Sequence, residues 1–111
     1  MSTIKTLANS KTHSVAFTIL QQLGHGTFRL MSGAYNFSAS KNSLSMTLRK
    51  NNLRAKYLSI VYNEGDDLYS MIFMSKDLAV LKQYDGVYSD MLQDIFQDET
   101  GLIIKVRFIA A

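Results

Sequence analysis

Hydrophobic residues that alternate through the middle of the chain constrain its fold more than any other feature. Residues 44–48 alternate Leu and Met with Ser and Thr, residues 57–62 are rich in β-branched and aromatic side chains, and residues 68–74 form a third apolar run. Successive side chains of a strand point to opposite faces of its sheet, so these runs predict strands with a buried face. The turn-forming residues 63–67, Asn-Glu-Gly-Asp-Asp, separate the last two runs. We therefore expect an antiparallel sheet.

Two other segments carry helical spacing. Apolar residues at i, i+3, i+4 and i+7 predict an amphipathic helix over residues 12–23, which the glycines after it end. This first stripe consists of Ala16, Ile19, Leu20 and Leu23. A second stripe predicts a helix that opens at Asp85-Gly86 and ends at Thr100-Gly101. The second stripe consists of Val87, Tyr88, Met91, Leu92, Ile95 and Phe96.

The remaining segments complete the expected order. Alternation predicts a strand over residues 27–32 and a closing strand over residues 102–109, with a bend or bulge at 33–37 and a polar loop at 38–43. Residues 75–83 fit either a strand or a short helix. The order α-β-β-β-β-α-β predicts an α+β domain: an antiparallel sheet of four to five strands, with two helices packed on one face.

Length and composition bound the class of protein. A chain of 111 residues is the size of one domain, which we place at residues 12–111 behind a flexible lead-in at 1–11. The chain contains no cysteine, which excludes disulfides, thiolate metal sites and cysteine nucleophiles. It has neither an apolar run of about 20 residues nor the apolar core of a secretion signal. We expect a cytoplasmic protein without a membrane partner.

Charge divides the chain unevenly. Residues 1–60 contain eight Lys and Arg and no Asp or Glu, whereas all nine acids lie in residues 61–111. The densest cationic stretch is Arg49-Lys50-Asn51-Asn52-Leu53-Arg54-Ala55-Lys56, between two expected strands. We interpret it as a basic β-hairpin tip in which Arg49, Lys50, Arg54 and Lys56 contact phosphates. Asn51 and Asn52 would add hydrogen bonds, and Arg29 and Lys41 would be outlying members of the patch.

The same stretch has a simpler interpretation, in which its charges keep an exposed hairpin from aggregating. Exposed rings near the cations would favour nucleic acid, because bases stack on them, and Tyr35, Phe37 and Tyr57 are the candidates. Rings in strands are more often part of a core. The sequence leaves both questions open.

Acidic residues on the second helix allow a different function. Asp90, Asp94 and Asp98 are spaced four apart, which places them on one helical face. Such a face is commonly solvated, but it could also meet a protein partner or a second copy of the chain. No pattern of catalytic, metal-ligating or cofactor-binding residues is present, and Gly24-His-Gly26 follows a helix as a C-cap does, whereas a phosphate loop precedes one.

Across residues 18–102, the pattern of glycine, aromatic and aliphatic positions resembles that of other proteins. The segments that carry it are Thr18-Ile-Leu-Gln-Gln-Leu-Gly24, Phe28, Met31, Gly33-Ala-Tyr-Asn-Phe37, Ala55-Lys-Tyr57, Asp67-Leu-Tyr69, Gly86-Val-Tyr88 and Glu99-Thr-Gly-Leu102. In these the chain resembles small uncharacterised proteins of bacteriophages and prophages. The resemblance implies a mobile-element origin and transfers no catalytic residue.

The sequence therefore predicts a non-enzymatic binding protein without a cofactor. The leading partner is DNA or RNA, bound through the basic hairpin. The alternative is a host protein, inhibited or regulated through the acidic helix or an exposed sheet edge. Association of identical copies is compatible with either.

Overall fold

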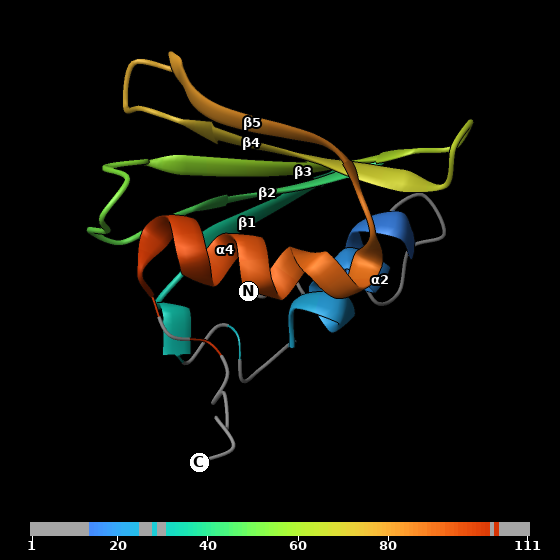
Figure 1. Ribbon diagram of the computed structural model, residues 1–111, viewed down its shortest axis with the longest axis horizontal. Coiled ribbons are helices and arrows are strands. Elements are labelled where there is room, and N and C mark those ends of the chain that lie inside the picture. Colours follow the sequence, from blue (N-terminus) through green and yellow to red (C-terminus); the bar gives the residue numbers. More distant parts are fainter. Residues whose placement is uncertain (1–13, 25–27, 29–30, 103, 105–111) are drawn as a thin grey trace.

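A five-stranded antiparallel meander forms the body of the protein, in which each strand pairs with the next along the chain (Figure 1). The computed structural model describes residues 14–24, 28, 31–102 and 104. The strands are β1 (Tyr35–Ser40), β2 (Ser43–Thr47), β3 (Tyr57–Asn63), β4 (Leu68–Met74) and β5 (Val80–Val87). The predicted strands at 44–48, 57–62 and 68–74 and the turn between the last two are confirmed.

Two helices cover one face of this sheet. They are α2 (Ser14–Leu23) and α4 (Leu92–Thr100), and the 3-10 turn η2 (Ser89–Met91) leads into the second (Figure 1). All four residues of the first predicted helical stripe are fully buried. The sheet contributes Leu44, Met46, Leu58, Ile60, Met71 and Phe73 to the same core, and α4 contributes Leu92 and Phe96. The predicted α+β class, with one antiparallel sheet and two helices, is confirmed.

Cross-strand pairing explains why this register is the stable one. Leu58 of β3 lies opposite Met46 on one side and Phe73 on the other, so apolar residues meet on the helix-covered face. A shift of one residue would turn all of them to solvent. Thr47, predicted to point outward, is buried. It pairs with Tyr35 and with Tyr57, two large neighbours that shield it.

Two expectations before β2 were wrong. In the predicted strand 27–32, the described residues Phe28, Met31 and Ser32 are helical, and the Phe28 amide donates to the Gly24 carbonyl at 3.3 Å. The expected loop at 38–43 is strand as far as Ser40, where β1 ends. The irregularity predicted at 33–37 is present, because the β1–β2 register shifts between Tyr35 and Ser38.

The chain after β4 also departs from expectation. The ambiguous segment 75–83 is a hairpin turn followed by the start of β5, which continues to Val87. The second helix therefore begins at Leu92 and not at Asp85-Gly86, although it ends at Gly101 as predicted, with φ of 74°. Leu102 and Ile104 lie outside any strand, and the rest of the predicted closing strand lies outside the described residues, as does the lead-in at 1–11.

Candidate functional site

The basic stretch forms a loop, residues 48–56, that is tied to the domain at several points. The Leu48 amide donates to the Lys56 carbonyl at 2.8 Å, and the Lys56 amide donates to the Met74 carbonyl of β4 at 2.8 Å. Between these anchors, the Asn52 amide donates to the Thr100 carbonyl at the end of α4, at 2.9 Å. The stretch connects the paired strands β2 and β3, as a hairpin tip does, and its backbone is also bonded to the end of α4.

The side chain of Asn51 organises the loop from within. Its amide nitrogen donates to the carbonyls of Arg49 and Ala55, both at 2.8 Å. Its carbonyl oxygen accepts from the amides of Leu53 and Ala55, at 3.1 and 3.2 Å. An asparagine side chain offers two donor hydrogens and two acceptor lone pairs, so all four are used inside the loop. Asn51 therefore positions its neighbours, and the contact to a partner predicted for it would break these bonds.

We expect Asn51→Ala to destabilise the domain by about 1–3 kcal/mol, because it leaves partly buried backbone groups without partners. Asn52→Ala is the matched control, since the Asn52 side chain is exposed and its backbone bond to Thr100 survives the change. That variant should stay within about 0.5 kcal/mol of the parent. Urea denaturation of the three proteins measures both values. Equal losses in the two variants would contradict the positioning role of Asn51.

Two glycines fit closely against the loop. A Cβ on Gly33 would lie 2.7 Å from Cδ of Arg49, and a Cβ on Gly101 would lie 2.2 Å from Nδ2 of Asn52. Both glycines have positive φ, 72° and 74°, which side-chain-bearing residues adopt at a cost. The loop side chains therefore lie against backbone at two separate points, which limits the directions that Arg49 and Asn52 can take.

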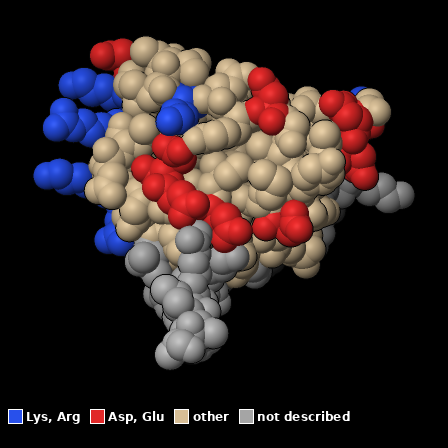
Figure 2. Space-filling model, viewed as in Figure 1, with Lys and Arg blue, Asp and Glu red and all other residues tan. Residues whose placement is uncertain are grey.

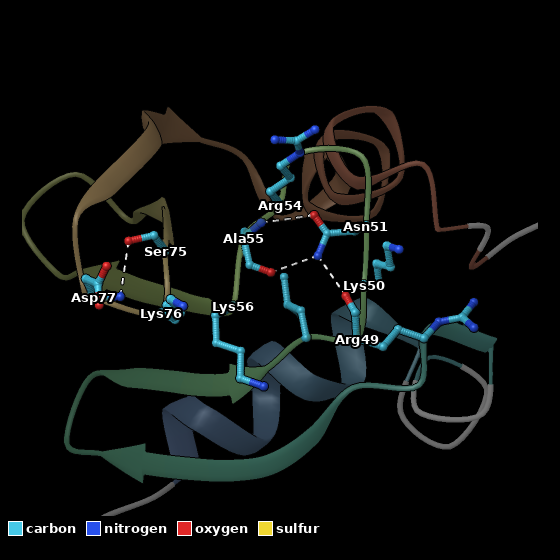
Figure 3. A pocket seen from close by; sticks show the side chains of 10 residues that line it. Arg49, Lys50, Asn51, Arg54, Ala55, Lys56, Ser75, Lys76 and Asp77 are labelled. Atoms are coloured by element: carbon cyan, nitrogen blue, oxygen red, sulfur yellow. Dashed lines mark hydrogen bonds between the residues drawn. The ribbon is translucent and has the colours of Figure 1, made fainter.

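The loop and the β4–β5 turn lie on either side of a surface hollow of about 720 Å³, which is open to solvent (Figure 3). We call it the basic hollow. It is lined by Leu48, Arg49, Lys50, Asn51, Arg54, Ala55, Lys56, Ser75, Lys76 and Asp77. Five of these residues are cations and one is an acid. Figure 2 shows that most of the Lys and Arg side chains visible on this face project from its left edge, below one acidic group, while most of the acids lie across the rest of the face.

Four of the predicted cations, Arg49, Lys50, Arg54 and Lys56, meet in the basic hollow. Lys76 joins them from the neighbouring turn, although the sequence places it 20 positions after Lys56. Sequence reasoning missed it because only the antiparallel pairing of β3 and β4 brings the two loops to one end of the sheet. The pairing of β3 and β4 was itself predicted from sequence. It could therefore have indicated that Lys76 lies near the basic loop.

The other predicted members do not join this group. Lys41 lies in the β1–β2 turn, at the opposite end of β2 from the loop. Arg29 lies outside the described residues. Asn52 belongs to the loop but does not line the hollow, and its amide bonds to Thr100 at the end of α4. The structure thus brings together the compact part of the predicted patch and separates Lys41 from it.

The three acids predicted to form one helical face do not line the basic hollow. Asp94 and Asp98 are on α4, but Asp90 is in η2, so the three acids do not share one α-helix as predicted. Nearby, Glu99 forms an ion pair with Lys82 at 3.7 Å and accepts a hydrogen bond from the Tyr84 hydroxyl. That hydrogen bond is the main cause of a raised pKa of Tyr84.

A second hollow, of about 350 Å³, lies between α2 and the far end of the sheet. Its lining includes Tyr62, Asp67 and Tyr69, whose two rings are 5.3 Å apart between centroids. The Tyr62 hydroxyl donates to Oδ1 of Asp67 at 2.5 Å. This bond is the largest cause that raises the pKa of Tyr62 to about 12, so the phenol keeps its proton at neutral pH. The pair ties the end of β3 to the β3–β4 turn.

Within the described part of the chain, no three His, Asp or Glu side chains converge as ligands of a metal ion. None of the helices described here is long and apolar enough to cross a bilayer. Comparison of the chain with protein-family models, with curated proteins and with solved structures finds no match. The basic hollow is therefore the feature of the described residues from which we infer a function.

Proposed function

We propose that this protein is a non-enzymatic nucleic-acid-binding module, which holds a phosphate backbone in the basic hollow. The observation that carries the proposal is that one open hollow, lined from two loops, has a single acid and five cations: Arg49, Lys50, Arg54, Lys56 and Lys76. Cations that line the same hollow raise its positive potential, which attracts a polyanion. Anchoring of the loop by Asn51 and by the two glycines supports the proposal, because an ordered loop loses little freedom when it binds.

Salt dependence tests this proposal directly. Each phosphate neutralised in a single strand contributes roughly −0.7 to the slope of log K against log salt concentration. If four cations contact phosphates, the slope is about −3, which corresponds to a roughly 50-fold loss of affinity between about 50 and 200 mM salt. Fluorescence anisotropy of a labelled oligonucleotide measures the slope. A parent protein that binds no oligonucleotide at low salt would refute the function.

Reversing the charge of the loop cations tests whether nucleic acid binds in the basic hollow. Replacing Arg49, Lys50, Arg54 and Lys56 together by glutamate should reduce affinity at low salt at least ~100-fold, because attraction becomes repulsion. Lys50→Glu and Lys41→Glu form a matched pair, since both residues are exposed and each change lowers the net charge by two. Only the first should weaken binding several-fold. Equal effects would show that net charge alone, and not the hollow, attracts the oligonucleotide.

A second candidate function is recognition of a host protein, which would be inhibited or regulated. The observation that favours it is the edge strand β5, where Val80 and Leu81 are exposed and Leu78 stands exposed in the turn before them. An extended segment of a partner could add to such an edge through backbone hydrogen bonds. Recovery of a stoichiometric protein partner after nuclease treatment would support this candidate. We also propose a phage or mobile-element origin, which rests on the sequence resemblance alone.

A further inference from the structure

An exposed aromatic ring stands beside the basic hollow. Of the three rings considered from sequence, Phe37 is buried and Tyr57 is partly buried, whereas Tyr35 is 45% exposed. Tyr35 is the first residue of β1 and lies opposite Thr47, the last residue of β2 before the loop. The ring is therefore held by strand pairing at the point where the cationic loop leaves the sheet.

Cations of the loop lie close to this ring. The Lys56 ammonium lies 3.4 Å from the Tyr35 hydroxyl and 5.9 Å from the ring centroid. Because the first distance is much the shorter, the charge sits at the hydroxyl end of the ring and not over its centre. Arg49 lies against Gly33, two residues before Tyr35. An aromatic face and two cations thus occur at one edge of the same surface.

We infer that the site recognises single-stranded nucleic acid, with a base stacked on Tyr35 and the adjoining phosphates in the basic hollow. The inference rests on the proposed function and narrows it. Single-strand-binding proteins combine a cationic groove with aromatic rings, because every unpaired base has a face that can stack. A duplex hides those faces, and its grooves are entered by a projecting helix or β-ribbon. Here the cations surround a hollow in a loop that lies back on Gly33 and Gly101.

The experiment compares the binding of single and double strands of one sequence. It then removes the proposed stacking contact in two ways, by changing Tyr35 in the protein and by removing bases from the oligonucleotide. Tyr35→Ala should weaken single-strand binding roughly 5- to 150-fold, the range for loss of one base–aromatic stack. Tyr35→Phe keeps the ring and should bind within about threefold of the parent. The salt slope should not change in either variant, because no phosphate contact is lost. Tyr88→Ala, at a tyrosine that is 61% exposed and does not line the basic hollow, is the matched control.

An oligonucleotide with abasic sites removes the bases and leaves the phosphates. The parent should bind it as weakly as the Tyr35→Ala variant binds the intact strand, and Tyr35→Ala should cause no further loss on the abasic strand. Equal binding of intact and abasic strands, or duplex binding as tight as single-strand binding, would overturn the inference. Either result would leave the proposed function standing if charge reversal still abolished binding. Failure of the parent to bind any strand would remove both.

Discussion

Replacing Phe96 by alanine is expected to lower the free energy of unfolding by about 3–5 kcal/mol, the largest effect of any single change proposed for this chain. Phe96 is fully buried on α4, and its ring meets that of Phe28 edge to face, with centroids 5.0 Å apart. The change removes the apolar area, leaves a cavity and loses the ring pair, which by itself contributes about 0.5–1.5 kcal/mol. A domain of this size is stable by only about 5–15 kcal/mol, so the shift in denaturation midpoint will be large.

Two further variants show whether burial is the cause. Tyr88→Ala removes an aromatic ring of similar size from the surface and should change stability by about 0.5 kcal/mol or less. Phe96→Leu keeps part of the apolar volume and should fall between the two. Urea denaturation monitored by circular dichroism gives all three values. A loss below about 1 kcal/mol in Phe96→Ala would mean that α4 does not close the core as described.

Segments with a buried face and a regular period were predictable from sequence. The α2 stripe buries every third to fourth residue, and the buried hydrophobic residues of β2, β3 and β4 recur at every second position, so their hydrophobic pattern reports their structure. Thr47 and Ser70 are the two polar residues of these strands that are also buried. β1 gives no such pattern because it is an edge strand in which only Phe37 is buried and Asn36 has φ of 54°. β5 is exposed along almost all its length, so pairing with β4 determines it and periodicity does not.

The start of the second helix and the candidate site show in another way what a local pattern leaves out. Asp85-Gly86 has the composition of a helix opening, but Asp85 accepts hydrogen bonds from Ser70 and Gln83 and remains in the sheet. These bonds also lower the pKa of Asp85. The cations of the basic loop were visible in sequence as a cluster. The contribution of Lys76, the exposure of Tyr35 and the internal use of Asn51 all depend on tertiary placement.

Gly101→Ala is expected to destabilise the domain by about 2 kcal/mol or more and to disturb the basic loop at the same time. Gly101 ends α4 with φ of 74°, a conformation that costs a side-chain-bearing residue roughly 1–2 kcal/mol. Its new Cβ would lie 2.2 Å from Nδ2 of Asn52, so the Asn52 side chain must also shift. Because the Asn52 amide is bonded to Thr100, movement of the Asn52 side chain strains the contact between the loop and α4.

The other glycines separate these two causes. Gly86 has a positive φ of 66°, and a Cβ placed on it has no atom within 4 Å. Gly86→Ala should therefore lose only the free energy of holding an alanine in the left-handed conformation. Gly65→Ala meets neither a positive φ nor a neighbour and should be close to neutral. Denaturation should therefore rank the losses as Gly101, then Gly86, then Gly65. Only Gly101→Ala should also weaken oligonucleotide binding, since only it displaces the loop that carries Arg49, Lys50, Arg54 and Lys56. Equal losses at Gly101 and Gly86, with unchanged binding, would show that Asn52 yields freely and that α4 does not hold the loop in place.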